Sequence, residues 1–161
     1  MFLGIDPGIL GSFSLYSIKE DFIIAQKIPY LKINGKKVID ATLLAGLISQ
    51  LISDHNPKIY LEQVHAMPKN GAVSMFRFGE AYGIIKGILA ALEVDWVDVT
   101  PRTWQKALLG PEAGNTKDRA LTHILAHFEG KAPSWMIKKR GSVDEQYIDA
   151  MCIAKYGSLY G

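Results

Sequence analysis

Apolar and polar positions alternate along the first thirty residues, and this alternation predicts three consecutive strands. Later in the chain, apolar residues recur either as short unbroken runs, typical of buried strands, or at helical spacing. The predicted strands cover 2–6, about 11–17, about 22–28, 58–63 and 94–99. The predicted helices cover 40–53, about 72–92, 101–109, 116–128 and a final segment that begins after Ser142 as its cap.

This order of elements predicts an α/β fold. Three hairpin-connected strands come first, and two further strands follow through helical crossovers. The expected architecture is therefore a five-stranded mixed sheet, with three antiparallel and then two parallel strands, flanked by helices. Asn34-Gly35 marks a turn before the first helix. No repeat or composition break divides the chain, so we expect a single domain over residues 1–161.

The composition narrows the class of protein. The 161 residues are 48% hydrophobic, which suits one domain with one sizeable core and excludes a disordered chain. No apolar stretch is long enough to span a bilayer, and the first residues lack the basic region of a secretion signal. The single cysteine, Cys152, excludes a disulfide framework within the chain. Together these features favour a cytoplasmic protein without a membrane partner.

Charge is unevenly distributed along the chain. Residues 102–140 hold eight Lys or Arg against three acidic residues, a net charge of +5, while the whole chain carries +2. The basic residues are Arg102, Lys106, Lys117, Arg119, Lys131, Lys138, Lys139 and Arg140. Such a segment is either a solvated surface or a site that attracts phosphate groups.

Three carboxylates occupy positions that a folded core would hold rigidly. Asp6 and Glu62 each close an apolar run, and Asp149 lies inside the predicted last helix. Acidic residues at strand ends usually face solvent, but three from distant parts of the chain suggest a cluster assembled by folding. Converging carboxylates repel each other unless a cation lies between them, and Mg²⁺ prefers oxygen ligands. The pattern therefore favours two-metal phosphodiester chemistry.

Five segments, in order, resemble the RuvC family of Holliday-junction resolvases, within the RNase H-like superfamily. The similarity runs over about residues 2 to 157. The segments are Gly4-Ile5-Asp6-Pro7-Gly8 with Gly11, Glu62-Gln63-Val64, Met75 to Gly87, Thr100 to Gly110, and Asp149-Ala150-Met151-Cys152-Ile153-Ala154.

The resemblance implies a homodimer that binds a four-way DNA junction and nicks two opposed strands, leaving 5′-phosphate ends. It implies two Mg²⁺ ions per active site, with Mn²⁺ as a substitute. Asp6 would bridge both ions, and Glu62 and Asp149 would each hold one. Lys106 and Lys117 would be active-site lysines, and His65 would lie near the junction centre. Whether a branch-migration motor is a partner is left open.

The chain departs from the family pattern at its fourth catalytic position, which is usually Asp or His. That position, three residues before Asp149, is Gln146 here. Either Gln146 supplies a neutral amide oxygen, or Glu145 takes the fourth place as a metal ligand. A competing interpretation is structural, because Ser142-Val143-Asp144-Glu145 fits a capping box in which Glu145 bonds the backbone of Ser142.

Candidate DNA contacts lie in the loops and in the basic segment. His65 and Lys69 follow the second motif, and Arg102 begins the predicted helix at 101–109. Lys138-Lys139-Arg140 precede the last helix, where they serve either phosphate contact or solubility.

Three functions remain open from the sequence. The first is a junction resolvase, the second a less selective nuclease of flaps and forks, and the third a non-catalytic junction-binding protein. Gln146 favours the third, and the three intact acids oppose it. Cleavage preference is not encoded in any recognisable motif.

Overall fold

The computed structural model describes residues 1–63, 71–111 and 114–160. Its centre is a five-stranded sheet in the order β3-β2-β1-β6-β7. The strands β1 (Phe2–Asp6), β2 (Ser12–Ser17) and β3 (Phe22–Lys27) pair antiparallel, whereas β6 (Lys58–Glu62) and β7 (Trp96–Val99) continue the sheet in parallel from β1. The predicted five-stranded mixed sheet is confirmed.

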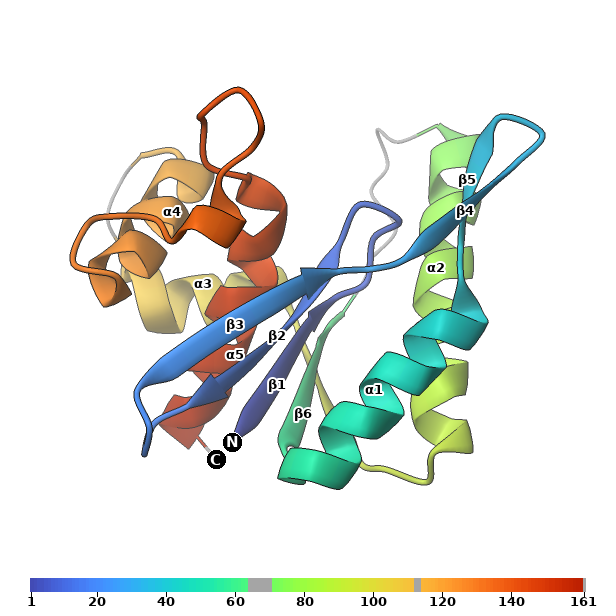
Figure 1. Ribbon diagram of the computed structural model, residues 1–161, viewed down its shortest axis with the longest axis horizontal. Helices are drawn as coiled ribbons and strands as arrows, with labels where there is room; N and C mark the ends of the chain where they lie inside the picture. The colour runs from blue at the N-terminus through green and yellow to red at the C-terminus, as the bar shows by residue number, and fades with distance from the viewer. Residues whose placement is uncertain (64–70, 112–113, 161) are drawn as a thin grey trace.

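Helices cover both faces of this sheet (Figure 1). One face carries α1 (Ala41–His55) and α2 (Ala72–Ala91), and the other carries α3 (Pro101–Leu109), α4 (Thr116–His127) and α5 (Ile148–Tyr160). Short 3₁₀ turns, η1 (Ser134–Met136) and η2 (Glu145–Tyr147), connect α4 to α5. In the described part of the chain, no helix combines the length and the apolar character needed to cross a membrane.

The residue pattern favours Asp40, Thr100, Asn115 and Ser142 as helix caps, and the structure has the first three. The side chains of Asp40, Thr100 and Asn115 accept hydrogen bonds from backbone N–H groups in the first turns of α1, α3 and α4. The predicted cap at Ser142 is wrong. The last helical segment begins at Glu145, and Asp144 caps it by accepting from the backbone N–H of Gln146.

Alternation along β1 gives the molecule two apolar cores. Leu3 and Ile5 pack with α1 and α2, whereas Phe2 packs with the helices on the other face. Gly4 shares the face of Phe2, where a Cβ atom would lie 2.3 Å from the carbonyl oxygen of Ala150 in α5. The missing side chain therefore lets α5 lie directly on β1.

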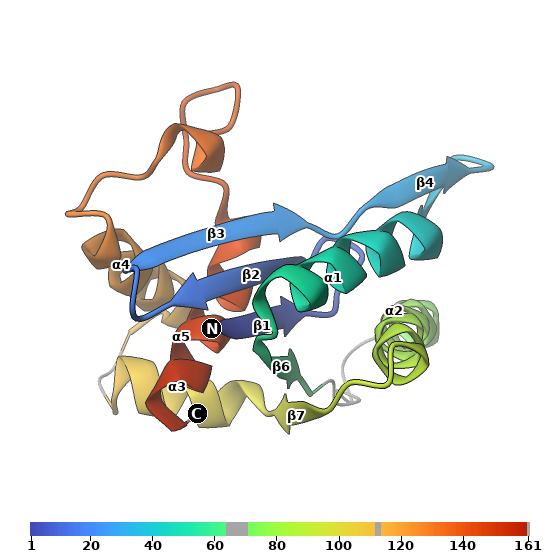
Figure 2. The same ribbon diagram turned by 60° about the horizontal axis from the view of Figure 1, so that its bottom comes forward.

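A second, two-stranded sheet was not predicted beyond its turn. The strands β4 (Tyr30–Ile33) and β5 (Lys36–Ile39) form a hairpin around Asn34-Gly35. Both turn residues have positive φ, 51° and 75°, as a type I′ turn requires. The hairpin extends past the end of β3, beyond the main sheet (Figure 2). Backbone hydrogen bonds fix its base, from Ile28 N–H to Gly11 O and from Asp40 N–H to Pro29 O.

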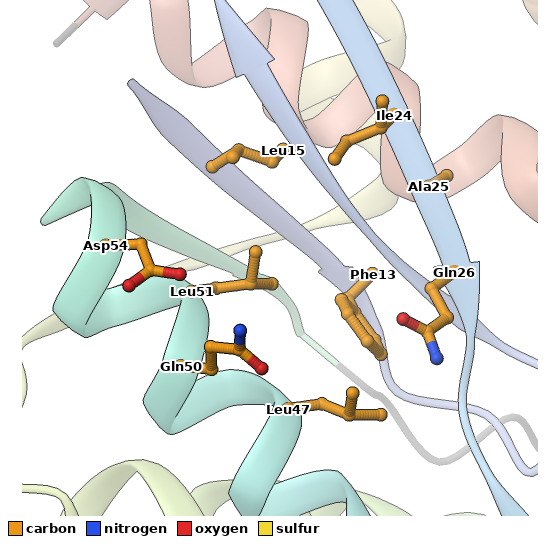
Figure 3. A pocket seen from close by; sticks show the side chains of 9 residues that line it. All are labelled: Phe13, Leu15, Ile24, Ala25, Gln26, Leu47, Gln50, Leu51 and Asp54. Carbon is orange, nitrogen blue, oxygen red and sulfur yellow. The ribbon is translucent and has the colours of Figure 1, made fainter.

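A hollow of about 250 Å³ separates α1 from β2 and β3 (Figure 3). Leu47, Leu51, Phe13 and Leu15 form much of its wall, and Gln26, Gln50 and Asp54 are its polar lining residues. None of the described site candidates lines this hollow.

Candidate active site

The alternation of side chains along the strands and the packing of α5 bring Asp6, Glu62 and Asp149 together at the carboxyl ends of the inner strands β1 and β6. The parallel strands β1 and β6 pair Ile5 with Leu61, so Asp6 and Glu62 follow at adjacent strand ends. Asp6 has the parity of Gly4, and Glu62 has the parity of Tyr60, so both belong to the face that α5 covers. Asp149 lies in the first turn of α5. The predicted convergence of the three acids is thus built into the topology.

A hollow of about 330 Å³ lies at these strand ends. Two of the three acids, Asp6 and Asp149, line it together with four other predicted site residues and two apolar ones. The other lining residues are Lys117, Lys138, Glu145, Gln146, Leu10 and Ile148. These residues come from the first turn of the chain, the start of α4, the loop before α5 and the start of α5. Folding therefore assembles a pocket with acids at its base and lysines in its wall.

Glu62 does not line this hollow, and its carboxylate is held by a hydrogen bond from α3. The indole Nε1–H of Trp104 in α3 donates to Glu62 Oε1 at 2.8 Å. Trp104 is only 1% exposed, so this donor is fixed by its packing. The sequence placed Trp104 in a family-like segment, but its role as an anchor for Glu62 was not predicted. An indole donor fixes a carboxylate without neutralising it.

Burial, and for Asp6 and Glu62 also repulsion by neighbouring acids, raises the pKa of all three carboxyl groups. Burial, and then the charge of Asp149, raises the pKa of Asp6 from 3.8 to about 7. Burial raises the pKa of Glu62 from 4.5 to about 7, with Asp6 and Asp149 adding to the effect and the Trp104 hydrogen bond opposing it. Burial also raises the pKa of Asp149, against the attraction of Lys117. A cation bound at these strand ends would stabilise the ionised form of all three carboxylates and so lower their pKa values.

We expect the metal-free protein to lose stability as the pH rises from about 4.5 to 7. A carboxyl group whose pKa is higher in the folded state stabilises the fold while it is protonated, and this contribution disappears as it ionises. For Asp6 and Glu62 the window runs from their ordinary values, 3.8 and 4.5, up to about 7. Each such group lowers the free energy of unfolding by about 1.4 kcal/mol per pH unit within that window.

Denaturant unfolding in EDTA at several pH values measures this effect. Burial lowers the pKa of both His123 and His127, which destabilises the fold at low pH and opposes the trend. Subtracting the free energy of unfolding of Asp6→Asn from that of the wild type at each pH cancels the contribution of the histidines, because both proteins contain them. A difference that does not change between pH 5 and 7.5 would contradict the raised pKa of Asp6.

Lys117 is the lysine that the structure links to the acids. It is exposed in the first turn of α4, lines the hollow, and lowers the pKa of Asp149 by its charge. Asn115 caps this helix by accepting from Lys117 N–H at 3.0 Å, as expected. The N-terminus of a helix carries partial positive charge. The wall of the hollow therefore offers two sources of positive potential at one point.

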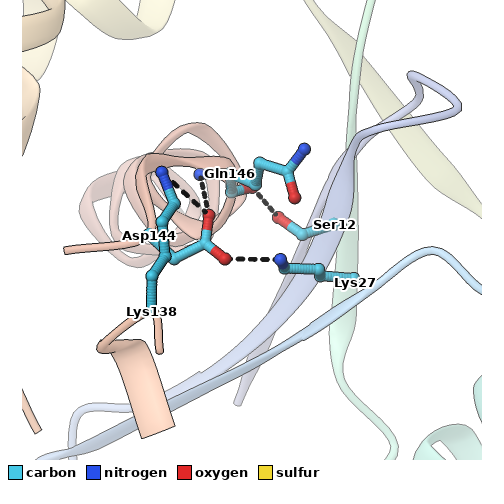
Figure 4. Close-up of polar contacts among 5 residues, drawn as sticks. All are labelled: Ser12, Lys27, Lys138, Asp144 and Gln146. Carbon is cyan, nitrogen blue, oxygen red and sulfur yellow. Dashed lines mark hydrogen bonds and ion pairs between the residues drawn. The ribbon is translucent and has the colours of Figure 1, made fainter. Parts of the chain in front are cut away.

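The start of α5 is held by a buried acid that was not predicted to matter (Figure 4). Asp144, 7% exposed, pairs with Lys27 of β3 and, at 3.9 Å, with Lys138. Burial alone would raise its pKa, but Lys27, Gln146 N–H and Lys138 together hold the pKa below its usual range. The carbonyl of Gln146 accepts from the fully buried Ser12 at 2.8 Å. The backbone of Gln146 is thus fixed from both sides.

These contacts decide between the interpretations of Glu145 and Gln146 only in part. The capping-box interpretation of Glu145 is wrong, because Asp144 is the cap. Glu145 is exposed, and both residues line the hollow. The Gln146 amide points away from Asp144 (Figure 4). Which of the two fills the fourth position stays open.

Several predicted residues lie elsewhere. Lys106 is exposed on α3 and does not line the hollow, because it follows the inward-facing Trp104 by two residues, about 200° around the helix. Arg102 is exposed near the start of the same helix, and Lys139 and Arg140 are exposed in the turn after Lys138. Their predicted roles stay predictions. His65 and Lys69 lie outside the described residues.

The donor set fits a hard divalent cation by its chemistry, since three carboxylates and a glutamine or glutamate offer oxygen ligands. Glu62 can offer Oε2, because Trp104 occupies Oε1. Among residues 1–63, 71–111 and 114–160, no group of three or more His, Cys, Asp or Glu side chains is gathered tightly enough to hold a metal ion as placed.

Two solved structures share this architecture. T. thermophilus RuvC in complex with a Holliday junction substrate matches with a TM-score of 0.59 and 16% identity, over 99% of this chain and 93% of that chain. The Thermus thermophilus RuvC structure matches with a TM-score of 0.55 and 19% identity, over the same shares. No protein-family model matches the chain, and the search of curated proteins finds no significant match. The predicted resemblance is confirmed at the level of the backbone: the chain has the RNase H-like fold of RuvC.

Proposed function

We propose that this protein is a magnesium-dependent endonuclease that resolves four-way DNA junctions. One observation carries the proposal. A fold shared with a RuvC bound to a Holliday junction places Asp6, Glu62 and Asp149 at the carboxyl ends of β1 and β6, beside Lys117. Hydrolysis of a phosphodiester needs a centre for cations and a group that balances the charge developing on phosphate, and these residues are of the right kind for both.

In this mechanism the chain's own residues hold and position the reactants. Asp6, Glu62 and Asp149 would hold two Mg²⁺ ions, with Mn²⁺ able to replace them. When bound, the metal supplies Lewis acidity toward the phosphate and an activated water. Trp104 keeps Glu62 in place through its indole N–H. Lys117 and the first N–H groups of α4 stabilise the negative charge that develops on the phosphoryl oxygens.

A homodimer is part of the proposal. The first half of α2 exposes large apolar side chains: Val73 is 69% exposed, Phe76 75% and Phe78 39%. Val73 and Phe76 are three residues apart and share a helix face, and exposed apolar surface of this kind is typical of a protein–protein contact. Two copies joined there would present two active sites to opposed strands of one junction.

The test is cleavage of a synthetic, immobile four-way junction by the purified protein in Mg²⁺, beside flap, fork and linear duplex substrates built from the same sequence. We expect paired symmetric nicks with 5′-phosphate ends in the junction and none in the duplex. Equal cutting of flaps and forks would favour the less selective nuclease. Tight junction binding without nicks, in Mg²⁺ and in Mn²⁺, would favour the non-catalytic binding protein.

Substitution at the fourth position separates its two candidates. If Glu145 is a ligand, Glu145→Gln lowers the nicking rate about 10- to 100-fold at low Mg²⁺, and added Mg²⁺ restores part of it. If Gln146 fills the position, Gln146→Ala has that effect and Glu145→Gln cleaves like the wild type. Single-turnover rates across a Mg²⁺ titration measure this. Wild-type rates for both variants would remove both residues from the metal shell.

A further inference from the structure

The β4–β5 hairpin has an electrostatic arrangement that folding alone does not explain. Its ten residues, 30–39, include Lys32, Lys36 and Lys37 and no acidic residue. Lys32 and Lys37 lie directly opposite each other in the strand register. Like charges at such positions destabilise a pair of strands, and an isolated hairpin is only marginally stable. An anion bound to this face would remove the conflict.

The register assigns the two faces of the hairpin different chemistry. Tyr30, Lys32 and Lys37 share one face, because directly paired residues point to the same side and the parity alternates along each strand. Lys37 Nζ also lies 4.2 Å from the centre of the Tyr30 ring. Leu31, Ile33, Val38 and Lys36 belong to the other face. Cationic and aromatic groups are therefore concentrated on one side.

This basic face adjoins the candidate active site. A hollow of about 170 Å³ is lined by Tyr30, Lys37, Lys27 and, at its border, Leu10 and Gln146. Leu10 and Gln146 also line the hollow that holds Asp6 and Asp149. The two hollows thus share a wall. Lys27 and Lys138 both pair with one carboxylate, Asp144, so two lysines lie where the two hollows meet.

The hairpin and the loop that carries Lys138 lie on opposite sides of the strand ends (Figure 1). Three intervals along a strand cover about 10 Å, so Tyr30 to Ile33 is long enough to follow a stretch of sugar–phosphate backbone. The lysines present charge without any base-reading geometry, which suits a duplex of any sequence.

We propose that the Tyr30–Lys32–Lys37 face of the hairpin binds the phosphate backbone of a duplex arm of the DNA as it leaves the active site. The inference rests on the proposed function and goes beyond it, because it assigns the DNA contact to an element outside the five-stranded sheet. Lys32 and Lys37 each neutralise one phosphate. Lys36, on the other face of the same hairpin, takes no part.

The test measures junction affinity across a range of salt concentrations for the wild type, Lys32→Ala/Lys37→Ala, and Lys36→Ala. Two lost phosphate contacts reduce the slope of log K against log salt by about 1.8. The double alanine variant should therefore bind about 60-fold more weakly than the wild type at 0.1 M salt, and about equally near 1 M salt. Lys36→Ala keeps the wild-type slope. Lys32→Arg/Lys37→Arg restores it, because the charges are retained.

Thermal unfolding of the variants and nicking by the wild type distinguish a folding defect, a failure of the hairpin proposal and a failure of the proposed function. Removing two opposed lysines leaves the Tm of the free protein unchanged or slightly higher. A falling Tm would mark a folding defect, and Lys32→Gln/Lys37→Gln, which also removes both charges but keeps longer side chains, would then replace the alanine variant in the same salt titration. If the wild type nicks the junction and the double alanine variant keeps its salt slope, the hairpin proposal is overturned and the proposed function stands. If the wild type neither binds nor nicks the junction, both are overturned.

Discussion

Asp6→Asn is expected to abolish junction nicking while leaving junction binding intact. Asp6 lines the hollow, neighbours Glu62 at the strand ends, and repels Asp149, so its carboxylate is central to any cation site there. The amide keeps the shape of the side chain but removes its charge. Loss of one electrostatic group at a reacting centre lowers the rate by about 10²- to 10³-fold. Single-turnover nicking under saturating enzyme measures the effect on chemistry alone.

Two comparisons make this result specific. Asp54→Asn, an exposed carboxylate of α1 on the other face of the sheet, serves as the matched control and should nick at the wild-type rate. Mg²⁺ should raise the Tm of the wild type at pH 8 and have less effect on Asp6→Asn, because one ligand is missing. Full nicking by Asp6→Asn, with a normal Tm, would exclude Asp6 from the chemistry and with it the proposed mechanism.

Gly4→Ala is expected to prevent α5 from docking. The added Cβ would lie 2.3 Å from both the carbonyl oxygen of Ala150 and the backbone nitrogen of Ala154, and backbone atoms of a packed helix have little room to move. Overpacking of this kind costs about 3 kcal/mol or more. The variant should therefore unfold at much lower denaturant concentration, and its nicking should fall because Asp149 moves away from Asp6.

Gly87→Ala, in the C-terminal part of α2, is the matched control. A Cβ there meets nothing within 4 Å, so this change should stabilise the protein by about 0.5–1 kcal/mol through helix propensity. Urea unfolding monitored by circular dichroism compares the two. Equal stability of Gly4→Ala and the wild type would contradict the close packing of α5 on β1.

The sequence predicted the main sheet because each of its strands is marked by a buried run or by alternation that its own residues reveal. The strands of the hairpin were not predicted, because β4 and β5 have four residues each and mix lysines with apolar side chains. Only its Asn34-Gly35 turn carried a local signal. The true position of the last cap was missed for a similar reason. Ser142 precedes Glu145 at capping-box spacing, whereas the residue three after Asp144 is Tyr147, and the partner that favours Asp144, Lys27, is 117 residues away.

For the site, position within the chain was enough to predict the three acids but not their surroundings. Asp6 and Glu62 end parallel neighbours, so their proximity follows from topology. The anchoring of Glu62 by Trp104 depends on the rotation of α3 about its own axis, and the same rotation turns Lys106 outward. The amphipathic pattern of α3 indicates that Trp104 faces the core, but it does not indicate that the indole N–H meets a carboxylate 42 residues earlier in the chain.

The packing of α5 has a consequence for the order of events during folding. This helix contacts β1, β2 and β6, so residues near the start of the chain meet residues synthesised more than a hundred positions later. Contacts of such long range form slowly. Until α5 docks, Asp149 is absent from the strand ends and one face of β1 is uncovered. A chain still emerging from the ribosome therefore carries two of the three acids without the third, so under the proposed function its candidate active site is incomplete until the last helix has docked.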